Sequence, residues 1–166
     1  MKDTAEREYR SSPGKRNQLQ FAVIEQFAPR FAPSAKLLYL GDPAYKTLFV
    51  ELDELRRFGF SANKHGKLPD VVLYWPRKKW LYLVEVVMSH GPVSPKRYRE
   101  LETIVSAGSV TRKYVSAFSN FEEYGRHIHG IAWDTSVWIA EVPDYLIHHD
   151  GKKFLRLRRP PKRKVR

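Results

Sequence analysis

Two acidic residues in the middle of the chain have the types and spacing for metal-dependent chemistry. Asp70 begins one strongly apolar segment, and Glu85 lies inside the next. The two segments are joined by the turn sequence Pro76-Arg-Lys-Lys79, so they predict a β-hairpin. A hairpin that closes symmetrically around this turn places Asp70 directly opposite Glu85.

Such a carboxylate pair needs a cation. Side chains directly opposite each other on antiparallel strands have Cβ atoms ~5 Å apart, where two negative charges destabilise the fold. Glu85 is the stronger anomaly, because it interrupts the apolar run Leu81-Tyr-Leu-Val-Glu-Val-Val87, and a buried carboxylate without a partner costs several kcal/mol. A divalent metal would satisfy both residues. Two alternatives stay open: Glu85 could pair with an arginine or with backbone amides, and a one-residue shift of register would put the two side chains on opposite faces.

A second unusual pattern is a pair of cations at the start of a helix. Ser94 and Pro95 predict the N-cap and the first residue of a helix, which places Lys96 and Arg97 in its first turn. The helix dipole disfavours cations there, but free N–H groups at a helix N-terminus bind anions, and two cations beside them favour a phosphate. The pair therefore predicts a phosphate-binding position one loop after Glu85. A solvated pair of basic residues is the alternative.

The periodicity of the apolar residues predicts the elements that must position these side chains. In chain order they are a helix over 17–31, a strand over 36–42, a helix over 45–58 closed by Gly59, strands over 70–75 and 80–87, a helix from 95 to before Gly108, a strand over 113–118, a helix over 121–131 and a strand over 135–142. This order predicts an α/β fold with a mixed central sheet flanked by helices.

The 166 residues suffice for one domain with its own core. Residues 1–16 are polar and predict a flexible N-terminal arm, and residues 17–151 carry the periodic segments of the folded domain. Residues 152–166 are dense in Lys and Arg and contain two prolines, so we expect a basic tail that is extended or disordered.

The composition indicates the partner and limits the chemistry. The net charge is +12 and the pI is about 10.0, which favours a polyanion, nucleic acid first and an acidic membrane second. Cysteine is absent, which excludes disulfides, thiolate zinc sites and cysteine nucleophiles, so a metal must use oxygen or histidine ligands. No apolar run approaches the ~20 residues of a membrane-spanning helix, and the N-terminus is too polar for a signal peptide. We expect a soluble, cytoplasmic protein with no membrane partner.

The histidines do not predict a zinc site. His127 and His129 are two apart on a predicted helix and point to different faces, and His148 and His149 are adjacent near a turn.

The residues around the two carboxylates resemble a known family. Pro69-Asp70 and Glu85, with fourteen residues between them, are similar to the short PD-(D/E)XK nuclease signature. Two longer strings resemble the BsuBI/PstI family of type II restriction endonucleases: His65-Gly-Lys-Leu-Pro-Asp-Val-Val-Leu-Tyr74 and Leu83-Val-Glu-Val-Val-Met-Ser-His-Gly-Pro-Val-Ser-Pro-Lys-Arg97. Residues 24–33 and 37–42 extend the similarity, which covers residues 18–142.

The resemblance implies a PD-(D/E)XK restriction-endonuclease-like fold and Mg²⁺-dependent hydrolysis of phosphodiesters in double-stranded DNA. It also implies a homodimer that acts on a palindromic site, a cognate DNA methyltransferase in the same system, and a bacterial or archaeal cell. Asp70, Glu85 and the backbone carbonyl of Val86 are the expected magnesium ligands. The expected DNA-binding residues are Arg97, His90, Lys67 and Lys46.

Further residues near the matched strings are weaker candidates. His65 and His90 flank the two strands and could contact phosphate or a metal-bound water, although ordinary loop histidines are the alternative. Asp42 follows a strand end, where turn formation is the expected role. Glu25 could supply another metal-linked carboxylate, but a solvated helical glutamate is the better interpretation.

The chain departs from the family pattern in two ways. The lysine of the short motif would fall at position 87, which is valine, so Lys96 on the following helix is the expected catalytic replacement. Family members also carry an N-terminal helical domain for DNA recognition, where this chain has only a short arm. We therefore expect its sequence specificity to be relaxed, different or absent.

Three rival functions remain open at this point. A non-catalytic DNA-binding subunit would keep the fold and the basic surface while another chain cuts. A structure-selective nuclease would cut branched DNA in preference to a linear duplex. An RNA-binding protein would use the basic tail.

Overall fold

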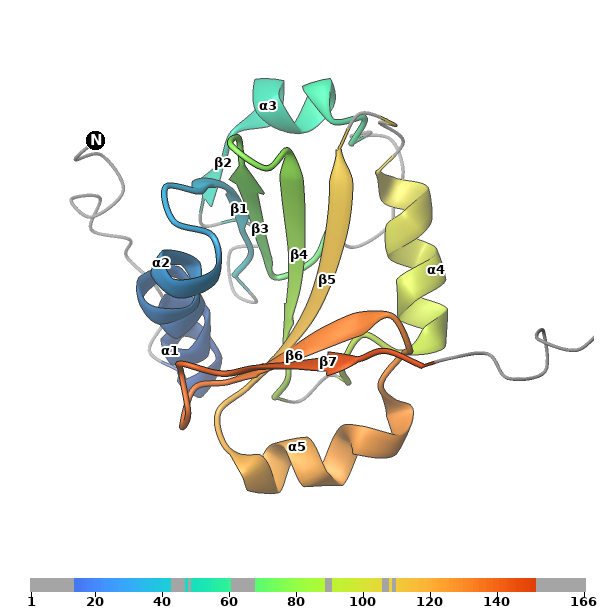
Figure 1. Ribbon diagram of the computed structural model, residues 1–166. Helices are drawn as coiled ribbons and strands as arrows, with labels where there is room; N and C mark the ends of the chain where they lie inside the picture. Colours follow the sequence, from blue (N-terminus) through green and yellow to red (C-terminus); the bar gives the residue numbers. More distant parts are fainter. Residues whose placement is uncertain are drawn as a thin grey trace, which may run out of the picture.

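A mixed sheet of seven strands, in the order β2-β1-β3-β4-β5-β6-β7, runs through the molecule (Figure 1). This computed structural model describes residues 14–42, 47, 49–60, 68–88, 91–105, 108 and 110–151. The strands are β1 (Lys36–Leu40), β2 (Phe49–Val50), β3 (Val71–Trp75), β4 (Trp80–Val86), β5 (Thr111–Phe118), β6 (Thr135–Ile139) and β7 (Leu146–His149). Strands β4, β5 and β6 are parallel to one another, and the other neighbours are antiparallel.

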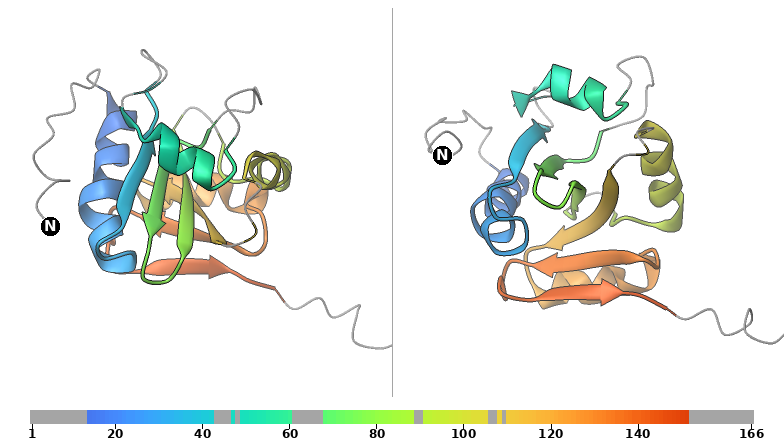
Figure 2. Two further views of the ribbon diagram at one scale, coloured as in Figure 1. Left: turned by 90° about the horizontal axis from the view of Figure 1, so that it is seen from above. Right: turned by 45° about the horizontal axis from the view of Figure 1, so that its top comes forward.

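Helices cover both faces of this sheet. They are α1 (Lys15–Ala22), the π-helical turn η1 (Val23–Phe27), α2 (Ala28–Phe31), α3 (Leu52–Arg57), α4 (Pro95–Ile104), α5 (Phe121–His127) and the 3₁₀ turn η2 (Ile128–Gly130). The continuous helix α1–η1–α2 packs on one face, and α3 and α4 pack on the other (Figure 2). The predicted α/β fold with a mixed sheet is thereby confirmed.

The N-terminal helix is tied to the sheet through its apolar side. Phe27 is fully buried and meets the rings of Tyr82 and Trp138 edge-on, with centroids 5.5 and 5.8 Å apart. Edge-to-face contacts of this kind add to the burial of the rings themselves. These contacts therefore fix the rotation of the helix about its own axis, and with it the direction of its polar side chains.

The predicted hairpin and its register are confirmed. Val71 pairs with Val84 and Trp75 with Trp80, and this register, continued by one residue, places Asp70 opposite Glu85. Glu85 also keeps its expected face, because the strand runs without a bulge through these pairs. Two predicted helix boundaries are confirmed as well: Ser94 Oγ accepts a hydrogen bond from Arg97 N at 3.1 Å, as an N-cap does, and Gly59 follows α3 with a φ of 81°.

Other boundaries differ from the prediction. The first helix begins at Lys15, so the expected arm over 1–16 ends too late and assigns Arg16 to the wrong element. The helix expected over 45–58 is wrong in its first part, because Phe49–Val50 form an edge strand against β1 and α3 begins only at Leu52. An aromatic and a β-branched residue beside an unpaired strand favour pairing over another helical turn.

The end of the domain also differs. The strand expected over 135–142 stops at Ile139, and the helix expected over 121–131 changes to η2 after His127. Strand β7 was not predicted, since only two apolar residues precede His148 and the pattern is too short to read as a strand. The predicted basic tail over 152–166 lies outside the described residues. Across the described part of the chain, no helix is long and apolar enough to span a membrane.

Candidate active site

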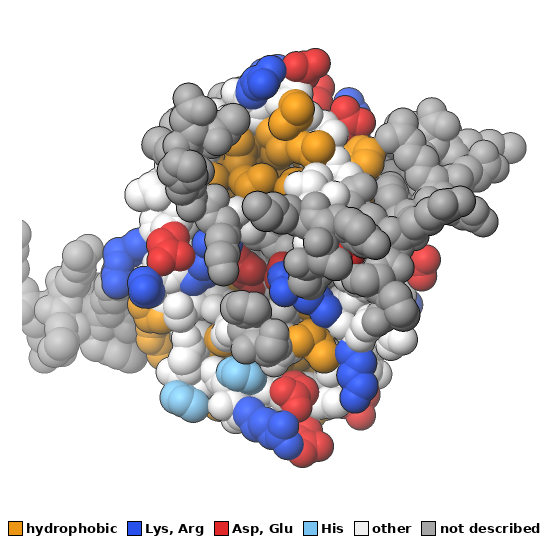
Figure 3. Space-filling view, turned by 180° about the vertical axis from the view of Figure 1, so that it is seen from behind, with side chains coloured by type: hydrophobic (Ala, Val, Ile, Leu, Met, Phe, Trp, Pro, Cys, Tyr) orange, Lys and Arg blue, Asp and Glu red, His pale blue; other side chains and the backbone are white. Residues whose placement is uncertain are grey.

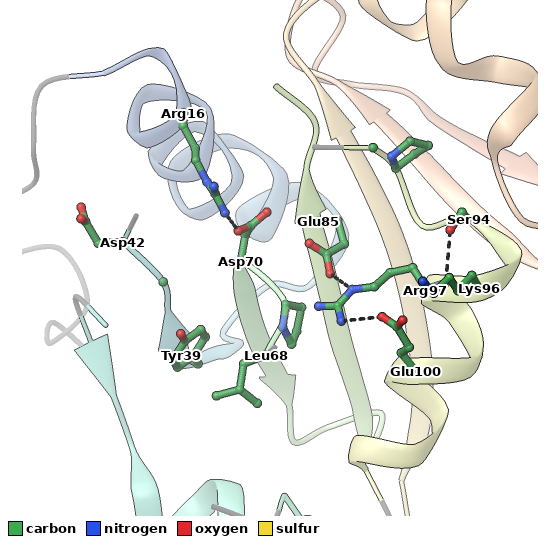
Figure 4. A pocket seen from close by; sticks show the side chains of 14 residues that line it. Arg16, Tyr39, Asp42, Leu68, Asp70, Glu85, Ser94, Lys96, Arg97 and Glu100 are labelled. Atoms are coloured by element: carbon green, nitrogen blue, oxygen red, sulfur yellow. Dashed lines mark hydrogen bonds and ion pairs between the residues drawn. The ribbon is translucent and has the colours of Figure 1, made fainter. Parts of the chain in front are cut away.

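Asp70 and Glu85 lie side by side at one end of the central strands of the sheet, in a cavity of about 880 Å³. Asp70 stands in the bend just before β3, and Glu85 is on the neighbouring β4. Figure 4 shows Arg16 reaching toward Asp70 from α1 and Arg97 reaching toward Glu85 from α4. Two carboxylates from adjacent strands thus meet two guanidinium groups from helices on opposite sides of the cavity.

Asp70 is held in position by three parts of the chain. Its Oδ2 accepts a hydrogen bond from Val86 N at 2.8 Å, and its backbone carbonyl accepts one from Gly41 N at 2.9 Å. Gln20 Nε2 donates to Gly41 O at 2.7 Å and to the Asp70 carbonyl at 3.4 Å, from a side chain that is 1% exposed. The remaining carboxylate oxygen, Oδ1, forms an ion pair with Arg16. The backbone therefore fixes one oxygen of Asp70 and leaves the other directed at the cavity.

Glu85 is buried beside a like charge. Its side chain is 13% exposed, and its Oε1 accepts a hydrogen bond from Arg97 Nε at 2.6 Å. Burial, and after it the negative charge of Asp70, raises the pKa of Glu85 to about 7, although the cation of Arg97 acts in the opposite direction. The ionised form of Glu85 is thus disfavoured even with Arg97 in place, and a further cation beside it would stabilise that form.

The two carboxylates fit a site for a divalent metal ion. Mg²⁺ is commonly held by one or two carboxylates, with water and substrate phosphate completing its shell. Asp70 and Glu85 supply two carboxylates from neighbouring strands, and Val86 directly follows Glu85 on β4, where its N–H donates to Asp70 Oδ2. Within the described ranges no group of three or more acidic or histidine side chains is placed to hold a metal.

The two cations of α4 lie the other way round from the prediction. Arg97, expected to bind DNA only, contacts Glu85, whereas Lys96 is exposed at the rim of the cavity. The helix begins at Pro95 under the Ser94 cap, and successive residues turn by about 100°, so only one of the two can face β4. The catalytic role of Lys96 stays a prediction.

Three residues of α1 belong to the site and were not predicted. Arg16 pairs with Asp70, Gln20 holds the backbone of Gly41 and Asp70, and Asn17 Nδ2 lies 3.3 Å from Asp42 Oδ2. A signal was present in the sequence, because Asn17 and Gln20 are polar residues three apart, which share one helix face beside the apolar stripe of Leu19 and Val23. A buried polar face on an otherwise apolar side indicates a partner beneath it.

The other candidates are placed as follows. Asp42 is 3% exposed and lines the cavity, so it does more than form a turn, and Glu25 is exposed as expected. His148 and His149 hydrogen-bond Ser136 and Tyr124, each at 2.9 Å. Lys46, Lys67, His65 and His90 lie outside the described residues.

The position of the missing motif lysine is apolar in three dimensions as well as in sequence. Val87 is fully buried and packs in a cluster with Phe118 and Ile139. A lysine at this position would have to place its ammonium among these side chains or displace them. The surroundings of position 87 therefore suit an apolar side chain and not a lysine.

Charged side chains of both signs also lie close together on the molecular surface. In the view from behind, basic and acidic side chains alternate across the middle of the visible face, and hydrophobic side chains gather above them (Figure 3).

Comparisons with known proteins agree with this geometry. Residues 2–152 match the family model described as the BsuBI/PstI restriction endonuclease domain. The chain is 44% identical over 144 residues to the type II restriction enzyme BsuBI of Bacillus subtilis, and 28% identical over 151 residues to the type II restriction enzyme AplI of Arthrospira platensis; each alignment covers 87% of this chain and 46% of the relative.

Among solved structures, the SdaI restriction endonuclease matches with a TM-score of 0.78 and 37% identity, over 92% of this chain and 47% of that one. The chain thus spans about half the length of the relatives it matches. The family match covers most of its residues, and the solved relative shares its fold. The chain belongs to the BsuBI/PstI restriction endonuclease family.

Proposed function

We propose that the protein is a Mg²⁺-dependent endonuclease that hydrolyses phosphodiester bonds in double-stranded DNA, as a type II restriction enzyme does. The observation that carries this proposal is the pair Asp70 and Glu85, held on neighbouring strands of a restriction-endonuclease fold at a position where burial and the charge of Asp70 disfavour ionised Glu85 without a further cation. Asp70, Glu85 and the carbonyl of Val86 would hold the metal. When bound, Mg²⁺ supplies a water of lowered pKa and neutralises charge on the phosphate.

The remaining side chains of the cavity have roles that follow from their places. The hydrogen bond from Val86 N keeps Asp70 aimed at the metal position. Lys96, exposed at the rim of the cavity in the first turn of α4, would bind a non-bridging phosphate oxygen or orient the attacking water. Arg97, in contact with Glu85, keeps that carboxylate oriented and lowers its pKa against the effect of burial.

Double-stranded DNA is the proposed substrate, with Lys46, Lys67 and His90 as further DNA contacts. The net charge of +12 supports a polyanion of this kind. A homodimer would bring two such cavities to the two strands of a palindromic site. A cognate methyltransferase would protect the cell's own copies of that site.

A digest of plasmid DNA with and without Mg²⁺ tests the proposal, with the fragment ends read by sequencing. We expect cleavage with Mg²⁺, and a loss of at least ~100-fold in Asp70→Asn and Glu85→Gln, because each removes the charge of one metal ligand at nearly constant volume. Arg30→Gln, which alters an exposed ion pair with Asp144, is the control. Wild-type protein that binds DNA but never cuts it would identify a non-catalytic subunit, and preferential cutting of branched DNA would identify a structure-selective nuclease.

A further inference from the structure

Arg16 occupies the one oxygen of Asp70 that the backbone leaves for a metal. Oδ2 is committed to Val86 N, whereas Oδ1 is paired with the Arg16 guanidinium. A cation that binds Oδ1 of Asp70 from the cavity therefore competes with this guanidinium for the same oxygen. The positive charge of Arg16 also opposes the binding of a metal ion at Asp70.

The guanidinium also has bonding capacity that Asp70 does not use. Arg16 Nε is buried and finds no hydrogen-bond partner among the described residues. The side chain is 27% exposed, and it lines the cavity with Glu85 and Lys96. A planar guanidinium that lines a cavity and has a donor without a partner is well suited to a phosphate, which it can bind through two parallel hydrogen bonds once it is released from Asp70.

From this geometry, and resting on the proposed function, we infer that Arg16 exchanges partners during the reaction. In the metal-free protein it neutralises Asp70 and stands in for the cation. When a divalent cation takes Oδ1, the guanidinium is released and binds the phosphate of the DNA that enters the same cavity. Arg16 thereby links metal binding to DNA binding, and it is a substrate-binding residue supplied by α1.

Two measurements on the full-length protein test this exchange. The first is the affinity for Ca²⁺ alone, by isothermal titration calorimetry, since Ca²⁺ takes the same oxygen ligands. Arg16→Gln removes the competing charge, so we expect Ca²⁺ to bind about tenfold more tightly. Lys15→Gln removes a charge one residue away on the same helix, from an exposed side chain, and should change the Ca²⁺ affinity by no more than about twofold.

The second measurement is the affinity for a short mixed-sequence duplex, in Ca²⁺ and in EDTA. Arg16→Gln should weaken binding in Ca²⁺, where the guanidinium is free, and have little effect in EDTA, where Asp70 holds it. Lys15→Gln should have the same effect in both. If Arg16→Gln does not fold, Arg16→Lys serves instead: it keeps the charge, so it should leave Ca²⁺ affinity near that of the wild type, and a tenfold gain would contradict the exchange.

The outcomes distinguish a failure of the Arg16 exchange from a failure of the proposed metal site on which it rests. If Asp70→Asn leaves Ca²⁺ affinity unchanged, the metal site is wrong, and the exchange fails with it. If Ca²⁺ affinity depends on Asp70 but not on Arg16, or if Arg16→Gln weakens DNA binding equally in Ca²⁺ and EDTA, only the exchange is overturned.

Discussion

Asp70 Oδ2 accepts its hydrogen bond from the backbone N–H of Val86, the residue directly after Glu85. One carboxylate of the pair is thus oriented by the strand that carries the other. The hydrogen bond to Val86 ties the Asp70 carboxylate to β4. The geometry of the pair is therefore set mainly by the hairpin, and α1 and α4 add the two guanidinium groups that surround it.

The first prediction concerns pH and the stability of the metal-free protein. The pKa of Glu85 is raised from 4.5 to about 7 in the fold, mainly by burial, so the folded state binds its proton more tightly than the unfolded state. The stability that this residue contributes is fully present below its unfolded pKa and is lost as the pH rises through about 7. We expect the free energy of unfolding in EDTA to fall over this interval, as urea denaturation would measure.

Glu85→Gln is the matched variant for this prediction, because it keeps the shape and removes the titration. Its unfolding free energy should change less between the two ends of the interval, and above the upper end its melting temperature should equal or exceed that of the wild type. A variant that loses as much stability as the wild type over this range would show that Glu85 does not carry the effect.

The second prediction separates the two cations of α4 by the pH dependence of cleavage. Arg97 lowers the pKa of Glu85, so Arg97→Ala should move the rising limb of the single-turnover pH–rate profile to higher pH. Lys96 is exposed at the rim, so Lys96→Ala should lower the rate by ~100-fold at every pH without moving the limb. Identical shifts in both variants, or wild-type profiles in both, would contradict these roles.

The third prediction is that restoring the motif lysine does not help the enzyme. Val87 lies fully buried against Phe118 and Ile139, so Val87→Lys must bury an ammonium in an apolar cluster, at a cost of several kcal/mol. We expect a large fall in melting temperature and no gain in cleavage. Val87→Met, of similar length without the charge, should be much better tolerated. A stable and more active Val87→Lys protein would show that the lysine can reach the site after all.

The hairpin and the face of Glu85 could be predicted from sequence because the information is local. A four-residue turn between two apolar strands leaves one register that buries both, and the carboxylate inside it then has a fixed position. The contribution of α1 could not be predicted in the same way, since Arg16 and Asp70 are brought together only when the helix packs on the sheet. The contact of Arg97 with Glu85 could not be predicted for a related reason: which residue of the first turn of α4 faces β4 depends on the rotation of a packed helix.

The two ion pairs of the site join residues at different separations along the sequence. This difference affects which of the pairs is lost first when the protein partly unfolds. The partners Arg97 and Glu85 are 12 residues apart, whereas Arg16 and Asp70 are 54 apart and meet only while α1 stays docked. Partial unfolding that detached α1–η1–α2 would remove Arg16 and Gln20 from the site, whereas the ion pair between Arg97 and Glu85 would stay intact. In native-state hydrogen exchange, the amides of α1 should then lose protection before those of β4, and limited proteolysis at the N-terminal helix should inactivate the protein while the sheet is still folded.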